Sequence, residues 1–248
     1  MTRPAIIALT FDFWNTLYAA DDGAMNLVRP KRLEALRGVL AAGGAHPTDD
    51  GLQQAYRAGF DAYMGAWGGG RHFGAREQVL FFLEYFSVEA ESIPPGTIAE
   101  AAAAIEDASL LADLQLLPGA RETIPALAAA GYRLGLISDT SLTPGRILRR
   151  FLERDGLLPS LAVLTFSDET GYPKPDARMF TRTLAALDAE PDQAAHVGDT
   201  PRTDIAGAKA LGITAIRYAA AADQDEPPEA DYVIRDHREL PGILQDRG

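Results

Sequence analysis

Short apolar runs alternate with stretches of helical spacing over most of this chain. The runs lack the polar alternation of a half-exposed strand, and this is typical of parallel strands that are buried on both faces. They lie at 6–12, 133–138, 162–166, 194–198, 213–218 and 232–234. Helical or alanine-rich patterns lie between them at 120–130, 143–155, 176–188 and 203–211. This alternation predicts βαβ units, and therefore an α/β fold built on a parallel sheet.

The segment between the first two runs has a different pattern. It shows helical spacing around 26–42, 49–65, 75–88 and 97–113 and no convincing strand. Nearly a hundred residues are too many for a simple crossover between two strands. We therefore expect an inserted all-helical domain at 19–117, with linkers near 19–23 and 114–119. The sheet domain would then comprise 1–18 and 118–248.

Composition narrows the class of protein further. The chain has 248 residues, 47% hydrophobic residues and no cysteine, so disulfides, zinc–thiolate sites and cysteine catalysis are excluded. Its net charge of −12 disfavours nucleic-acid binding, which depends on neutralising phosphates. No apolar stretch is long enough for a membrane span, and the N-terminus leads directly into the first strand without room for a signal peptide. We expect a cytoplasmic protein with no membrane or nucleic-acid partner; the oligomeric state is not predicted.

Polar residues follow four of the predicted strands. They are Asp12, Ser138, Lys174, and the pair Asp199 and Asp204. Each taken singly has an ordinary explanation, such as a helix cap or a turn. The carboxyl ends of parallel strands face one edge of the sheet, however, and ligands bind in the crevice at that edge. The spacing therefore predicts that these side chains share one site.

These residues and their order resemble the motifs of the haloacid dehalogenase (HAD) superfamily. The first is Phe-Asp-Phe-Trp-Asn-Thr-Leu at 11–17, followed by Leu-Ile-Ser-Asp-Thr, Gly-Tyr-Pro-Lys-Pro and Gly-Asp-Thr-Pro-Arg-Thr-Asp, which contain the other polar residues. The resemblance covers nearly the whole chain. It implies a Rossmann-like core and identifies the helical insertion as the cap that one subgroup carries after its first motif.

The resemblance also implies roles for individual residues. Asp12 would be the nucleophile of a phosphatase, assisted by Ser138 and Lys174, and would form an aspartyl phosphate. Mg²⁺ would be held by Asp12, Asp199, Asp204 and the backbone carbonyl of Trp14. The substrate, a small phosphorylated metabolite, would be bound by residues of the same motifs: Asn15, Thr16, Ser138, Asp139 and Lys174.

Trp14 departs from the family pattern. Most phosphatases of the superfamily carry an aspartate at this position as general acid, whereas an indole has no proton to supply. Loss of such a group typically costs about 10²- to 10⁴-fold in rate. Three explanations are open: an activated leaving group, a proton donor from the cap such as His72, or a weak enzyme.

Two other functions remain as alternatives. Haloacid dehalogenases of the superfamily also place an aromatic residue two positions after the nucleophile, and they need neither a metal nor a leaving-group acid. Against this, the last motif here has the acidic, metal-binding form, and Asp139 stands where those enzymes have asparagine. The other alternative is a HAD-fold protein that is non-catalytic or weakly active, which only Trp14 favours.

Overall fold

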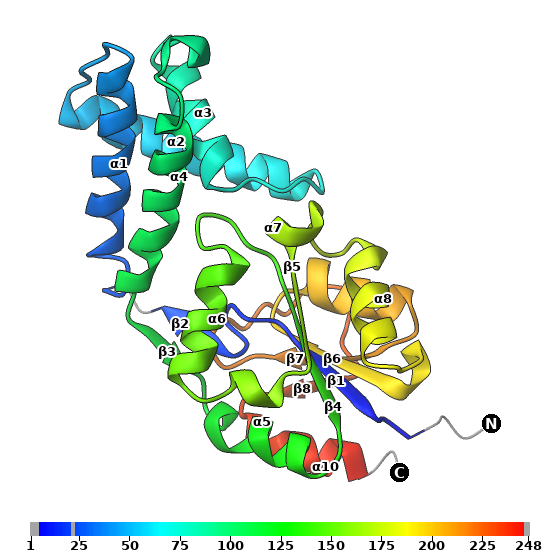
Figure 1. Ribbon diagram of the computed structural model, residues 1–248. Coiled ribbons are helices and arrows are strands. Elements are labelled where there is room, and N and C mark those ends of the chain that lie inside the picture. The colour runs from blue at the N-terminus through cyan, green and yellow to red at the C-terminus, as the bar shows by residue number, and fades with distance from the viewer. Residues whose placement is uncertain (1–4, 21–22, 246–248) are drawn as a thin grey trace. The chain divides into compact units, whose positions relative to one another are not determined.

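The computed structural model describes residues 5–20 and 23–245, and its larger sheet has six parallel strands (Figure 1). The strands of this sheet are β1 (Ala8–Phe11), β4 (Arg133–Ser138), β5 (Val163–Phe166), β6 (Ala194–Gly198), β7 (Thr214–Tyr218) and β8 (Tyr232–Ile234). All residues of β1, β6 and β7 are buried, as their continuous apolar runs predict. The expected class of fold, a parallel α/β sheet, is confirmed.

The strand order β5-β4-β1-β6-β7-β8 puts β1 between two strands that come much later in the chain. Thr10 of β1 lies opposite Gly135 of β4 on one side and His196 of β6 on the other. The chain builds the sheet outward from β1 first in one direction and then in the other. Such a reversal of strand order is the point at which open α/β sheets bind ligands.

Helices pack against both faces of the sheet (Figure 1). The helices of this part of the chain are α5 (Ala120–Ala129), α7 (Ser167–Thr170), α8 (Ala177–Ala186), α9 (Ala206–Ala210) and α10 (Leu240–Gln245), and α6 (Gly145–Arg154) precedes β5. On one face, Met179, Phe180 and Leu184 of α8 pack with Ala8 and Ile137 of the strands. Burial of such side chains, each about 1.5–3 kcal/mol, fixes the strand ends that carry the polar residues.

The inserted segment forms a helical unit with its own core. Its main helices are α1 (Val28–Ala42), α2 (Asp49–Gly68), α3 (Ala75–Tyr85) and α4 (Thr97–Asp107). Leu36, Leu40, Val79, Phe82 and Ile105 are fully buried among these helices. None of the helices in the described part of the chain is long and apolar enough to span a bilayer.

The predicted linkers form structure that the sequence pattern did not reveal. Residues Tyr18–Ala20 (β2) and Leu114–Leu116 (β3) form a two-stranded sheet at the two ends of the insertion. The expectation of no strand within 19–117 is therefore wrong at its margins, because three-residue strands are too short to show a period.

The chain separates into two compact units, and their boundaries lie close to the predicted domain boundaries without coinciding with them. One contains Met1–Ala19, Leu114–Asp139 and Arg149–Gly248; the other contains Ala20–Asp113 and Thr140–Leu148. The segment Thr140–Leu148, which begins at the last residue of the second motif, therefore groups with the helical unit although it lies in the range assigned to the sheet domain. The identity of the helical unit as a cap stays a prediction.

Candidate active site

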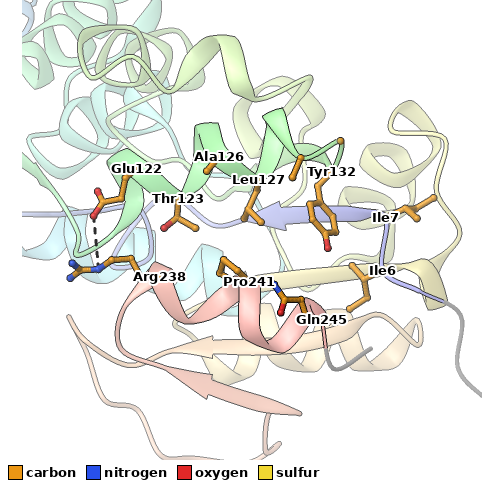
Figure 2. Close-up of a pocket in the computed structure, with 12 residues that line it drawn as sticks. Ile6, Ile7, Glu122, Thr123, Ala126, Leu127, Tyr132, Arg238, Pro241 and Gln245 are labelled. Carbon is orange, nitrogen blue, oxygen red and sulfur yellow. Dashed lines mark ion pairs between the residues drawn. The ribbon is translucent and has the colours of Figure 1, made fainter. Parts of the chain in front are cut away.

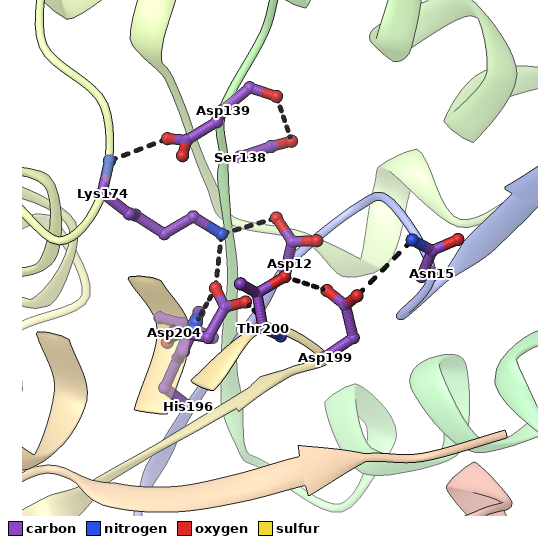
Figure 3. A network of polar contacts seen from close by, with 10 residues as sticks. Asp12, Asn15, Ser138, Asp139, Lys174, His196, Asp199, Thr200 and Asp204 are labelled. Atoms are coloured by element: carbon purple, nitrogen blue, oxygen red, sulfur yellow. Dashed lines mark hydrogen bonds and ion pairs between the residues drawn. The ribbon is translucent and has the colours of Figure 1, made fainter. Parts of the chain in front are cut away.

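Three buried carboxylates meet where β1 and β6 end (Figure 3). Asp12 follows β1 and Asp199 follows β6, while Asp204 lies in a π-helical turn at Pro201–Ile205. One oxygen of each carboxylate lies within 4.8 Å of the others. Single π turns are frequent at functional sites, and this one places Asp204 beside β6.

Lys174 joins two of these carboxylates. Its Nζ donates to Asp12 Oδ1 at 2.5 Å and to Asp204 Oδ1 at 2.6 Å, and its side chain is only 2% exposed. Its backbone N–H donates to Asp139 Oδ1 at 2.8 Å, which fixes the loop between α7 and α8 (Figure 3). Asp139, expected to bind substrate, thus also positions the lysine; its contact with substrate stays a prediction.

The charges of this cluster are strongly coupled. Burial, with the charges of Asp204 and Asp199, raises the pKa of Asp12 in spite of Lys174. Burial and Asp204 also raise the pKa of Asp199, to about 6. For Asp204 burial is outweighed by Lys174 and His196, so its pKa is lowered, and for Lys174 burial is outweighed by the carboxylates, so its pKa is raised. Lys174 therefore pairs with both Asp12 and Asp204, whereas no positive side chain contacts Asp199 within the described residues.

Sequence reasoning missed the residues that anchor Asp204. His196 Nε2 lies 3.1 Å from Asp204 Oδ1, and its Nδ1 lies 2.9 Å from Thr10 Oγ1. Burial lowers the pKa of His196, so we assign a neutral ring that donates from Nε2 to Asp204 and accepts from Thr10. The backbone N–H of Thr200 donates to Asp204 Oδ2 at 3.0 Å. The sequence feature that could have indicated them is a polar residue inside each of two otherwise apolar strands, Thr10 in β1 and His196 in β6.

The first motif continues beyond Asp12 as a tight turn. The backbone N–H of Asn15 donates to Tyr18 O at 2.7 Å, and Asn15 adopts a positive φ of 54°, which asparagine tolerates better than most residues. Its Nδ2 donates to Asp199 Oδ2 at 3.4 Å. Trp14 is half-buried and meets the Phe13 ring edge-on, with the ring centroids 5.0 Å apart.

The remaining predicted site residues are less tightly tied to the cluster. Ser138 is fully buried at the end of β4, and its hydroxyl donates to the carbonyl of Asp139 at 3.2 Å. The buried hydroxyl of Thr16 has no hydrogen-bond partner within the described residues. The roles of Ser138 and Thr16 in binding substrate, of the Trp14 carbonyl in binding metal, and of His72 as a proton donor stay predictions.

A separate cavity of about 750 Å³ lies at the opposite ends of the strands (Figure 2). Its lining includes Ile6 and Ile7 before β1, Tyr132 before β4, and Leu127 of α5. These positions are at the amino ends of the strands, away from Asp12. None of the three clustered carboxylates lines this cavity. Although the cavity is large, we therefore do not assign the active site to it.

The acidic cluster fits a divalent cation. Three carboxylates and one ammonium leave a formal charge of −2 in a region that solvent hardly reaches. Buried charge of this kind is costly unless it is paired. Carboxylate oxygens are the ligands that Mg²⁺ prefers, and Mg²⁺ usually takes one or two of them with waters and substrate oxygens.

The chain belongs to the haloacid dehalogenase-like hydrolase family, whose model matches residues 6–212. This confirms the resemblance found in the motifs. Over 160 residues the chain is 32% identical to a ribulose-1,5-bisphosphate 5-phosphatase from Halopiger xanaduensis, covering 63% of this chain and 64% of that protein, which is less than two thirds of its length.

Two further matches extend over nearly the whole chain. A glyceraldehyde 3-phosphate phosphatase from Methanopyrus kandleri is 27% identical over 93% of this chain and 91% of its own length. The crystal structure of a 2-haloacid dehalogenase from Pseudomonas syringae superposes with a TM-score of 0.66 at 24% identity, covering 98% of this chain and all of that one. At that identity the second match shows the fold alone.

Proposed function

We propose that this protein is a Mg²⁺-dependent phosphohydrolase that acts on a small phosphorylated metabolite through an aspartyl phosphate at Asp12. One observation carries the proposal: Lys174 forms ion pairs with both Asp12 and Asp204, and Asp199 lies in the same buried cluster. The phosphatases among its relatives support the substrate class.

Asp12 attacks the phosphorus atom through a carboxylate oxygen. The new bond joins that oxygen to phosphorus, while the bond from phosphorus to the ester oxygen breaks and the leaving alcohol takes up a proton. Water then attacks the aspartyl phosphate, releases inorganic phosphate and regenerates the Asp12 carboxylate. The reaction needs alignment and charge compensation more than further covalent steps by the protein.

The surrounding residues supply alignment and charge. Lys174 holds Asp12 in place and presents a positive charge to the phosphoryl group, and the Ser138 hydroxyl donates to a phosphoryl oxygen. Asp12, Asp199 and the Trp14 carbonyl would hold Mg²⁺, with Asp204 as a ligand through water or as an orienting group. Mg²⁺ at this position would reduce the repulsion between the Asp12 carboxylate and the phosphate dianion.

The direct test is hydrolysis of p-nitrophenyl phosphate with Mg²⁺ and with excess EDTA. We expect turnover with Mg²⁺ that EDTA removes and that added Mg²⁺ restores. Turnover that is equal under both conditions would contradict the metal-dependent mechanism.

Carbon–halogen hydrolysis is the second candidate, and the aromatic side chain of Trp14 favours it. In this case Trp14 would form an apolar wall around a small 2-haloacid. The three carboxylates argue against it, because a metal-free site would leave their charge poorly compensated. Release of chloride from 2-chloropropionate in the presence of EDTA would establish this activity, and absence of both activities would favour a non-catalytic protein.

A further inference from the structure

A small cavity of about 310 Å³ lies wholly within the helical unit. Arg32 of α1, Gly59 of α2, Gln78 of α3 and the segment at Ser141 line it, together with aromatic side chains of α2. A volume of this order is at the low end for small-molecule sites, which are mostly apolar with a few polar groups of defined position. The cavity is therefore the right kind of space for a small metabolite.

Arg32 is the chemically unusual residue of this cavity. Its side chain is only 4% exposed, and within the described residues no carboxylate pairs with it. Burial lowers the pKa of Arg32, and the Tyr56 hydroxyl is the group that opposes this effect. A buried guanidinium without a carboxylate is costly, and arginine is the side chain best suited to bind carboxylate or phosphate through two parallel hydrogen bonds.

The hydrogen bonds of Arg32 go to neutral groups, and its Nη1 accounts for none of the four to α4 and the Ser141 segment. Nε donates to the carbonyl of Ile105 at 3.3 Å, and Nη2 donates to Ser109 Oγ at 2.7 Å and, at 3.2 Å, to both Leu142 O and Thr143 Oγ1. These bonds connect α1 with the end of α4 and with the segment after the second motif. Nη1 takes part in none of these four bonds, and the Tyr56 hydroxyl also hydrogen-bonds the guanidinium. Since none of these partners is a carboxylate, an oxyanion in the cavity can still supply the negative charge at Nη1.

Gln78 adds a second buried polar group. Its side chain is 3% exposed and lines the same cavity, and its amide makes no hydrogen bond within the described residues. Gly59 permits its position, because a Cβ on Gly59 would lie 2.3 Å from Gln78 Nε2. A glycine within a helix costs about 0.8–1.0 kcal/mol relative to alanine, so this close approach has a cost in helix stability.

We propose that this cavity is a binding site for the oxyanion of a small organic acid, a carboxylate or phosphate group held by Arg32 Nη1 and the amide of Gln78. The ligand supplies the negative charge that Arg32 lacks and acceptors for Nη1 and for the Gln78 amide. The site uses residues of the helical unit only, so it does not depend on the proposed hydrolysis.

Binding is measured directly by ¹⁵N NMR on the full-length protein without Mg²⁺, following the Arg32 Nε–H and the Gln78 side-chain NH₂. Titration with 2-phosphoglycolate should give saturable shifts of both groups, whereas ethylene glycol, which is neutral, should give none. Glycolate and inorganic phosphate, titrated separately, distinguish which oxyanion is preferred. Absence of saturable shifts with all three anions would overturn the proposal.

The decisive variant is Gly59→Ala, which forces the Gln78 amide to move while leaving Arg32 intact. We expect at least tenfold weaker binding. Gly65→Ala is the matched control, because it lies on the same helix and a Cβ there meets nothing within 4 Å; its affinity should stay within twofold of the wild type. Equal affinities of wild type, Gly59→Ala and Gly65→Ala would contradict the proposed site.

A second variant covers the case in which Gly59→Ala does not fold. Gln78→Met keeps a similar volume and removes the amide donors, and it should also weaken binding about tenfold. Full affinity in a folded Gln78→Met protein would exclude Gln78 from the site and overturn the proposal as stated.

An activity measurement distinguishes whether the bound oxyanion is a group of the substrate or a separate small anion. If the oxyanion is part of the substrate, Gly59→Ala should lower the kcat/KM ratio of 2-phosphoglycolate to ethyl phosphate, and Gly65→Ala should not. If a separate small anion binds, this ratio should stay constant while the NMR titration still shows the loss of affinity. Either result supports the pocket, and the NMR titration alone decides whether it exists.

Discussion

Asp12, which we propose as the nucleophile, is held in place by its surroundings. It is 5% exposed and its carboxylate is held by Lys174 Nζ at 2.5 Å, so it has little freedom of orientation. Burial and the neighbouring carboxylates raise its pKa, which means that the charged form depends on Lys174 and on any bound cation. Substitution of Asp12 should therefore alter the charge balance of the cluster as well as the proposed reaction.

Asp12→Asn should reduce p-nitrophenyl phosphate hydrolysis to background, because the amide cannot form the aspartyl phosphate. The fold should persist, since the substitution removes a buried charge and keeps the shape of the side chain. Steady-state kinetics and circular dichroism measure the two effects. Turnover by the folded variant above one hundredth of the wild-type rate would contradict a nucleophilic Asp12.

Under the proposed mechanism, Trp14 leaves the reaction without the usual acid that protonates the leaving group. Without a general acid at this position, the rate should depend steeply on the pKa of the leaving alcohol, and aryl phosphates should react much faster than alkyl phosphates. A series of substituted phenyl and alkyl phosphates provides the measurement. A rate that does not vary along the series would mean that another acid is present, and His72→Ala would then test the cap residue.

The substitution Trp14→Asp tests whether a general acid restored at position 14 increases the rate. It should raise alkyl phosphate turnover, by up to the about 10²- to 10⁴-fold that a general acid contributes. Trp14 is half-buried against Phe13, so the melting temperature must be compared first to exclude a loss of packing. No gain in a stably folded variant would show that position 14 does not limit the reaction.

At the level of elements, the connection from β6 to the following π turn sets the geometry of the acidic cluster. Gly198 ends β6, and a Cβ at this position would lie 2.3 Å from Asp204 Cγ. Only a glycine lets the Asp204 carboxylate lie against the strand and meet both Lys174 and His196.

Gly198→Ala should therefore displace Asp204 and weaken Mg²⁺ binding at least tenfold. Gly38→Ala on α1 is a suitable control, because its Cβ would meet nothing within 4 Å and helix propensity alone would favour it by about 1 kcal/mol. Calorimetric titration with Mg²⁺ of the wild type and both variants gives the comparison. An unchanged affinity in Gly198→Ala would show that Asp204 has no part in metal binding.

The long buried strands could be predicted from sequence, and the short or irregular elements could not. Runs such as 194–198 and 213–218 match β6 and β7 because continuous apolar character reports burial on both faces. The π turn has no sequence period of its own, and β2 and β3 have too few residues to show one. In the site, order along the chain predicted which acids meet, whereas the support of Asp204 by His196 depends on the register between β1 and β6.

At the scale of the whole molecule, the proposed Mg²⁺ site would link metal binding to stability and pH. The chain carries a net charge of −12, and the buried carboxylates add local repulsion to this general excess of negative charge. A bound cation stabilises the folded state because the unfolded chain has no assembled site. The protein should therefore melt at a higher temperature in Mg²⁺ than in EDTA.

The direction of the pH effect follows from Asp199, whose pKa of about 6 in the folded state lies above its usual value of 3.8. Between these values the folded state binds more protons than the unfolded state, so this group's contribution to stability in EDTA falls as the pH rises from about 4 to 6. Above pH 6 the carboxylate is ionised and ready for Mg²⁺. Below pH 6 the Asp199 carboxyl must lose its proton before Mg²⁺ can bind, so Mg²⁺ affinity should fall about tenfold for each unit by which the pH is lowered.

Asp199→Asn isolates this group from the other titrating residues. In EDTA at pH 7.5 the variant should melt at the same temperature as the wild type or above it, because it removes a poorly compensated charge. In excess Mg²⁺ the order should reverse, and the advantage of the wild type should shrink as the pH is lowered through 6. Melting temperatures of both proteins over pH 5–8 make this comparison. A Mg²⁺-induced rise that is equal in both proteins, or that does not change with pH, would place the cation elsewhere than at Asp199.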